Sequence, residues 1–150
     1  MPTHLVISKG TELLRVPLVS LMYVSADGNY SLVVTRDSHK TLMSLQLGQI
    51  ETLIAQQLGS SGSVFIRAGR GLIINTDYIN YIDISKQLLV LSDCEGSRHE
   101  LSASREVLVK LKEGRQPLAD QFFLRRVYEI LPLAVVELCK TLGIVVVVGR

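Results

Sequence analysis

Two arginines in a short glycine-rich stretch are the side chains of this sequence best suited to bind an anion. Arg67 and Arg70 lie within the stretch Phe65–Asn75, between a Phe-Ile pair and a Leu-Ile-Ile run. These apolar residues are typical of buried strand ends, so the arginines are predicted to lie on a stiff turn between two strands. Gly69 and Gly71 leave Arg70 without bulky neighbours, and its guanidinium could reach a phosphate or the edge of a guanine.

The same stretch also has a purely structural interpretation. No Asp or Glu occurs from Thr52 to Thr76, so no neighbour in the sequence neutralises either arginine. Taken alone, however, the stretch is more simply a solvated turn, because most surface arginines contribute little. Arg67 has two open roles, a contact with phosphate or support of the turn from the edge of the core.

A third arginine, Arg105, is predicted to lie in the first turn of a helix. This helix covers Glu106–Lys112, and Ser104 is its expected N-cap. A cation gains nothing from the helix dipole at this end. The position of Arg105 has a physical reason if a phosphate binds there too, since helix N-termini attract anions.

The elements that must position these arginines are mostly short strands. Runs of β-branched and aromatic residues alternate with turns rich in Gly, Asp, Asn and Ser, which predicts a mainly β fold with a little α-helix. A helix packed on this sheet is predicted between Ser44, its N-cap, and Gly59, its stop. A flexible loop, Gly59–Ser63, follows it. The predicted strands are Leu5–Ile7, Thr11–Val16, Val19–Val24, Tyr30–Thr35, Thr41–Met43, Phe65–Ile66, Leu72–Ile74, Asp77–Ile84, Leu88–Leu91 and Arg98–Leu101.

The chain is predicted to divide into a domain and a tail at Gly114–Pro117. Of the 150 residues, 47% are hydrophobic, so residues 1–114 can form one domain with its own core. Residues 115–150 are predicted to be a helical, apolar appendage, either a helical hairpin or loose tail, or an element that forms a homodimer. Pro132 and two charged residues interrupt its apolar run, so we do not expect it to span a membrane.

Composition and spacing argue against an enzyme, a metal site or a bound cofactor. The net charge is +2, so any basic surface for nucleic acid must be local. Cys94 and Cys139 lack the spacing of metal ligands; buried free thiols are the simpler expectation for them, and a disulfide between them is the alternative. His4, His39 and His99 stand far apart, and no nucleophile elbow or phosphate-binding lysine loop occurs. Without a signal peptide, the protein is expected in the cytoplasm.

Several segments, taken together in their order and spacing, resemble the LytTR-type DNA-binding domain. Val19–Tyr30 looks like the opening signature of that family, and Phe65–Asn75 is similar to its second signature. Tyr78–Ile82 matches the strand that follows, and Leu101–Arg105 resembles the serine-arginine segment before the last helix. The resemblance covers residues 5–114.

The resemblance implies an elongated stack of small antiparallel sheets with one short packed helix, in a bacterial transcription regulator. In that family, loops enter successive major grooves of double-stranded DNA. The family usually has a histidine before the arginine of the second signature and a serine after it, where this chain has Gly69 and Gly71. The contacts of those two side chains are therefore lost, while Arg70 keeps its own. Because the resemblance begins close to Met1, no N-terminal receiver domain is expected.

The resulting prediction is a sequence-specific regulator that binds double-stranded DNA, with a homodimer expected at least on DNA. The alternative is a non-catalytic protein–protein interaction module acting through the C-terminal tail or a sheet edge. Weaker candidates for phosphate contacts are Lys9, Arg36 and Lys40. The predicted DNA-binding residues are Asn29, Tyr30, Arg67, Arg70 and Arg105.

Overall fold

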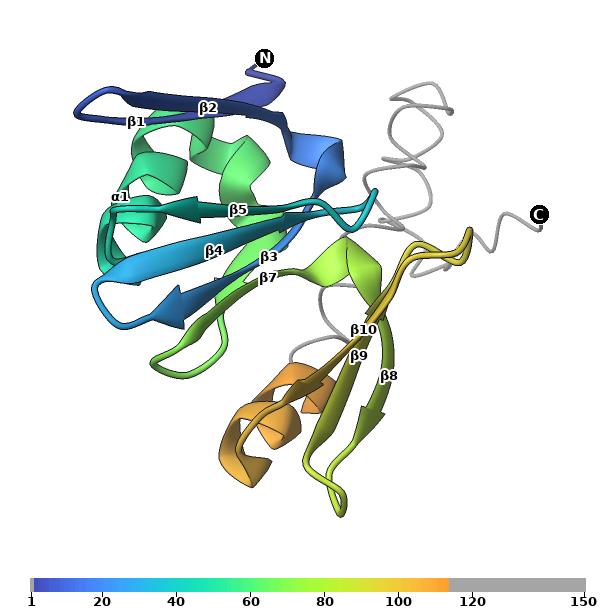
Figure 1. Ribbon diagram of the computed structural model, residues 1–150. Helices are drawn as coiled ribbons and strands as arrows, with labels where there is room; N and C mark the ends of the chain where they lie inside the picture. The colour runs from blue at the N-terminus through green and yellow to red at the C-terminus, as the bar shows by residue number, and fades with distance from the viewer. Residues whose placement is uncertain (1, 114–150) are drawn as a thin grey trace, which may run out of the picture. The chain divides into compact units, whose positions relative to one another are not determined.

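The structure is a computed structural model that describes residues 2–113 (Figure 1). The chain divides into two units, Met1–Leu108 and Val109–Arg150, and only residues 109–113 of the second are described. The predicted appendage at residues 115–150 lies outside the described residues. The strands, in chain order, are β1 (His4–Lys9), β2 (Glu12–Pro17), β3 (Leu21–Asp27), β4 (Tyr30–Thr35), β5 (Lys40–Met43), β6 (Phe65–Arg67), β7 (Leu72–Asn75), β8 (Ile79–Asp83), β9 (Leu88–Ser92) and β10 (Arg98–Ser102).

Within the described residues the strands form a two-, a three- and a five-stranded sheet. β1 pairs with β2, the order β10-β9-β8 makes the second sheet, and the order β5-β4-β3-β7-β6 makes the third. All of the pairings found in this part of the chain are antiparallel. Short turns join most neighbouring strands, which is the connection that antiparallel pairing allows. The predicted mainly β fold with antiparallel sheets and one main helix is confirmed.

The main helix, α1 (Leu47–Leu58), covers the five-stranded sheet and touches β1, β3 and β7. Its buried face, made of Leu47, Ile50, Ile54 and Leu58, joins the hydrophobic core that the strands contribute. The side-chain amide of Gln57 adds a polar link to β1. It accepts from the backbone N–H of Val6 at 2.9 Å and donates to the Val6 carbonyl oxygen at 2.7 Å.

The start of α1 differs from the sequence prediction. The N-cap is Gln46 and not Ser44, and Gln46 forms a capping box with Gln49, whose Oε1 accepts from the Gln46 N–H at 2.9 Å. Just before this N-cap, the Leu45 carbonyl oxygen accepts a hydrogen bond from the Ser31 Oγ of β4 at 2.7 Å. The helix therefore begins only after this segment has been fixed against the sheet.

The end of α1 falls at Gly59, as predicted, but the segment after it is not a loose loop. Gly59–Val64 forms a 3₁₀ helix, and Gly62 within it is buried. A Cβ added to Gly62 would lie 3.0 Å from Ile54 Cγ2 and 3.2 Å from Leu58 Cβ. The serines and glycines of this segment therefore allow close packing on α1, where the sequence suggested flexibility. Short 3₁₀ helices also occur at Leu18–Ser20 and Thr76–Tyr78.

Candidate nucleic-acid interface

Two hairpin turns lie side by side at one end of the five-stranded sheet, which we call the tip of the sheet (Figure 1). The first turn, Gly28–Asn29, joins β3 to β4. The second turn, residues 68–71, joins β6 to β7, and the start of β7 pairs with the end of β3. The Ala26 N–H of β3 donates to the Gly71 carbonyl oxygen at 2.8 Å, which joins the two turns directly. The antiparallel order of β4, β3, β7 and β6 is the reason why two turns far apart in sequence meet here.

The first turn of the tip presents Asn29 and Tyr30. Gly28 has φ +60°, which suits the first central position of a two-residue hairpin turn of type II′. Both side chains are exposed, Tyr30 by 49%. Neither has a side-chain hydrogen bond to any described residue, so an amide and a phenolic hydroxyl are available for contacts with a ligand.

In the second turn, the guanidinium of Arg67 is used inside the protein. Its Nη1 donates to Glu51 Oε2 of α1 at 2.7 Å. Its Nε donates to the Gly69 carbonyl oxygen at 3.0 Å, and its Nη2 donates to the Arg70 carbonyl oxygen at 2.8 Å. No acidic neighbour in the sequence was available to Arg67, and the structure supplies a carboxylate from 16 residues earlier. Glu51 lies one residue before the acid-free segment, and α1 brings it to the turn.

Arg70 lies at the end of this turn and differs from Arg67 in its environment. Its side chain is exposed and makes no ion pair with any described residue. The Ala68 N–H donates to the Leu72 carbonyl oxygen at 2.8 Å and closes the hairpin, while Gly69 adopts φ +78°. A side chain rarely tolerates this backbone conformation, so a glycine is needed at position 69. The turn therefore projects one free guanidinium from a constrained backbone.

The third segment of the tip is the start of the helix at residues 105–113. Ser104 is its N-cap, as predicted: the Val107 N–H donates to Ser104 Oγ at 3.4 Å, and the Leu108 N–H donates to the Ser104 carbonyl oxygen at 3.0 Å. The first helical residue is Arg105, which is exposed and has no ion pair among the described residues. A Cβ built on Gly69 would lie 3.5 Å from Val107 Cγ2, so the arginine turn rests against this helix start.

The charges at the tip are mixed in sign. Arg70 and Arg105 are exposed and have no ion pair with any of residues 2–113, but Asp27 and Glu106 are exposed carboxylates in the same segments. The capacity of the tip to bind an anion therefore depends on two free guanidinium groups and not on a large basic surface. Each of these groups can donate two parallel hydrogen bonds to a phosphate or to a base edge.

The three weaker candidates for phosphate contacts, Lys9, Arg36 and Lys40, lie away from the tip of the sheet. Lys40, the first residue of β5, pairs with Val34 near the end of β4 that is opposite the tip, and Arg36 follows that end. Lys9 lies in the β1–β2 hairpin. Arg36 donates to Glu95 Oε2 at 2.8 Å and lies 3.9 Å from Asp93 Oδ2. Its charge is compensated by these two carboxylates.

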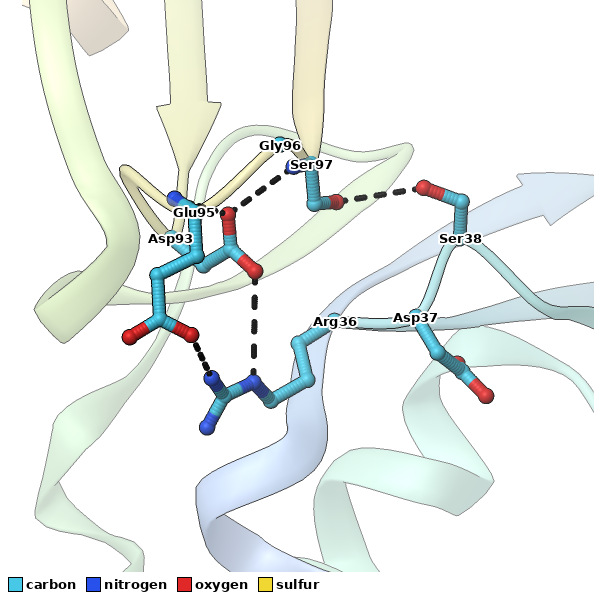
Figure 2. A pocket seen from close by; sticks show the side chains of 7 residues that line it. All are labelled: Arg36, Asp37, Ser38, Asp93, Glu95, Gly96 and Ser97. Carbon is cyan, nitrogen blue, oxygen red and sulfur yellow. Dashed lines mark hydrogen bonds and ion pairs between the residues drawn. The ribbon is translucent and has the colours of Figure 1, made fainter.

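An open cavity of about 360 Å³ lies at this opposite end, between the β4–β5 and β9–β10 turns (Figure 2). Sequence reasoning did not identify it, because its two sides are far apart along the chain. Ser38 and Ser97 meet across it, with 3.2 Å between their Oγ atoms. Three carboxylates and an already paired arginine make it unsuitable for a phosphate. Its lining residues are Arg36, Asp37, Ser38, Asp93, Glu95, Gly96 and Ser97.

Two further residues lie near this cavity, and the first of them, Cys94, differs from the sequence expectation. Cys94 is a free thiol but is exposed, because it lies with φ +60° on a turn and not in the core. His99 packs edge-on against Tyr23, with 5.4 Å between the ring centroids. Burial lowers the pKa of His99 below its usual value.

Within residues 2–113, no group of three or more His, Cys, Asp or Glu side chains is arranged to hold a metal ion. No helix in the same part of the chain is long and apolar enough to cross a membrane.

Comparisons with known proteins agree with this fold. Among solved structures, the LytTr DNA-binding domain of a Bacillus cereus protein, described as a methyl-accepting/DNA response regulator, matches with a TM-score of 0.51 and 20% identity. The match covers 74% of this chain and 94% of that chain, and at this identity it concerns the fold alone. The comparison with curated proteins gives no match. The family model for the LytTr DNA-binding domain matches residues 11–115, so the chain belongs to the LytTr DNA-binding domain family.

Proposed function

We propose that this chain is a sequence-specific transcription regulator that binds double-stranded DNA through the tip of its five-stranded sheet. Family membership gives DNA binding as the general activity. The proposal adds the contacts: Arg70 and Arg105 at base edges in the major groove, with Asn29 and Tyr30 at a base edge or a phosphate. The proposed regulator acts in the cytoplasm of a bacterium.

The observation that carries the proposal is the convergence of three separate segments at the tip. The 2.8 Å hydrogen bond from Ala26 to Gly71 joins the two turns. The second turn also lies close to the helix start, since a Cβ added to Gly69 would be 3.5 Å from Val107 Cγ2. Arg70 and Arg105 are both exposed and unpaired within the described residues. This arrangement supports one surface that offers several donors to a single duplex.

The chemistry of these donors suits the two tasks of DNA recognition. Contacts with phosphates provide most of the affinity, and contacts with base edges provide sequence preference. An arginine fork matches the two acceptors of guanine, and an asparagine amide matches the donor and acceptor of adenine. The free N–H groups at the start of the 105–113 helix favour a phosphate close to Arg105.

Selection of bound duplexes from a random pool tests the proposal. We expect an enriched motif, and affinity for it that falls steeply between 50 and 200 mM salt because counterions are released from the phosphates. Two copies of the motif spaced one helical turn apart would further support a dimer on DNA. A pool without enrichment, together with salt-independent binding, would contradict the proposal.

A second candidate function is a protein–protein interaction module that uses a sheet edge or the tail. One observation favours it: Leu42 of the edge strand β5 is 48% exposed. An apolar interface of this kind depends little on salt, so the same titration separates the two functions. The tail, residues 115–150, lies outside the described residues and stays a proposed dimer element.

A further inference from the structure

The hydrogen bonds of Arg67 fix the backbone on both sides of Arg70. The Gly69 carbonyl belongs to the peptide plane before Arg70, and the Arg70 carbonyl belongs to the plane after it. Arg67 donates to the first at 3.0 Å and to the second at 2.8 Å. Because peptide groups are planar, holding both carbonyls restricts the two backbone dihedrals of Arg70 and hence the direction of its Cα–Cβ bond.

We call the two hydrogen bonds from Arg67 to the Gly69 and Arg70 carbonyl oxygens the clamp, and a residue of α1 anchors it. The third nitrogen of the Arg67 guanidinium, Nη1, donates to Glu51 Oε2 at 2.7 Å. A guanidinium is a rigid planar fork, so fixing one nitrogen also fixes the directions of the other two. Glu51 therefore orients the two donors that hold the turn, although it does not itself touch Gly69 or Arg70.

The Arg67–Glu51 ion pair is too exposed to contribute much to the stability of the whole fold. The side chains of Arg67 and Glu51 are 32% and 54% exposed, and ion pairs at such exposure contribute little to global stability. Their effect is instead local, because they reduce the number of conformations that the turn samples before it binds. A preorganised turn loses less entropy on binding, which strengthens the contacts of the side chain that it presents.

We infer that Glu51 and Arg67 are positioning residues for the DNA contact of Arg70, and that Arg67 is not itself a phosphate contact. This inference rests on the proposed DNA-binding function. It separates the two roles that the sequence left open for Arg67. It also gives a role in DNA recognition to Glu51, an acidic residue whose charge would otherwise only repel phosphate.

Glu51→Ala and Arg67→Lys test the inference. Alanine is a good helix former, so the first variant keeps α1 intact. Lysine keeps the positive charge at position 67 but replaces a fork of three nitrogens by one. The matched control is Glu95→Ala, which removes a carboxylate paired with an arginine at a similar distance, 2.8 Å, at the opposite end of the sheet. Binding is measured on the selected duplex and on a scrambled duplex over a range of salt.

Each test variant is expected to lower the preference for the selected duplex by at least about fivefold, the lower range of one bidentate base contact. The salt slope and the melting temperature stay as in the wild type, and Glu95→Ala changes none of these quantities. The inference is overturned if Glu51→Ala strengthens binding to both duplexes alike, because Arg67 would then be freed to bind phosphate. Preserved preference in Arg67→Lys also overturns it.

A second readout does not need DNA. In the free protein, ¹⁵N relaxation of the amides of residues 69–71 should report increased motion in Glu51→Ala and no change in Glu95→Ala. Unchanged relaxation in Glu51→Ala would overturn the clamp itself. If the wild type has no preferred duplex, the proposed function fails, whereas a wild-type preference that survives in Glu51→Ala refutes only the positioning role.

Discussion

Replacement of Arg70 by alanine separates base reading from nonspecific attraction to DNA. In the structure Arg70 is exposed and unpaired within the described residues, so its side chain contributes little to the folded state. We expect the free energy of unfolding of Arg70→Ala to change by less than about 0.5 kcal/mol. The clamp on the turn is retained, since Arg67 bonds to the backbone carbonyl of residue 70 and not to its side chain.

The expected loss lies in binding to the selected duplex. One bidentate arginine–guanine contact contributes about 1–3 kcal/mol of discrimination, which is about 5- to 150-fold in relative affinity. A scrambled duplex, where Arg70 has no correct base, should lose much less. Arg70→Lys should fall close to the alanine variant, because lysine keeps the charge but lacks the fork. Arg15→Ala is the control for loss of charge, because Arg15 of β2 is exposed and forms no ion pair in the part of the chain that the structure describes.

Fluorescence anisotropy titrations on both duplexes at 50, 100 and 200 mM salt measure these quantities. If Arg70 contacts a phosphate instead, affinity falls alike for both duplexes and the salt slope decreases by about 0.9. An Arg70→Ala variant with the wild-type preference and the wild-type slope would refute the assignment of Arg70 to the interface.

Other parts of the structure give further expectations. Arg105→Ala should lower discrimination while leaving thermal stability unchanged, as measured by the same titrations and by melting curves. Gly62→Ala should destabilise the fold by about 1–3 kcal/mol in denaturant titrations, because its Cβ would lie 3.0 Å from Ile54 Cγ2. Gly48→Ala, where an added Cβ meets nothing within 4 Å, should instead stabilise α1 by about 0.4–1 kcal/mol. Burial lowers the pKa of His99, so the unfolded chain binds more protons there. Stability should therefore fall as the pH decreases from about 6.5 through the lowered pKa, and His99→Gln should weaken this pH dependence in melting curves.

Local signals in the sequence were sufficient to predict the hairpins. Gly28 in the first turn and Gly69 before Arg70 both adopt positive φ, and a glycine at such a position can be recognised from the sequence without tertiary context. Ser104 was also predictable as an N-cap, since capping depends on residues within one helical turn.

Long-range contacts account for what the sequence did not show. Glu51 neutralises Arg67 across 16 residues, and only the packing of α1 on the sheet brings the two together. Arg36 meets Glu95 across 59 residues, so a cation that looked available for phosphate is already paired. The start of α1 was missed for a similar reason. Ser44 is a better N-cap by residue type than Gln46, but the contact of Leu45 with Ser31 delays the helix.

An NMR titration of the ¹⁵N-labelled protein with the selected duplex tests the central claim most directly. The claim is that the tip of the five-stranded sheet faces DNA, while the cavity at its other end does not. The account predicts that the amide signals of residues 28–30, 69–71 and 105 shift on binding, and that those of residues 36–38 and 93–97 do not. Shifts confined to the cavity end of the sheet, with the tip unchanged, would contradict it.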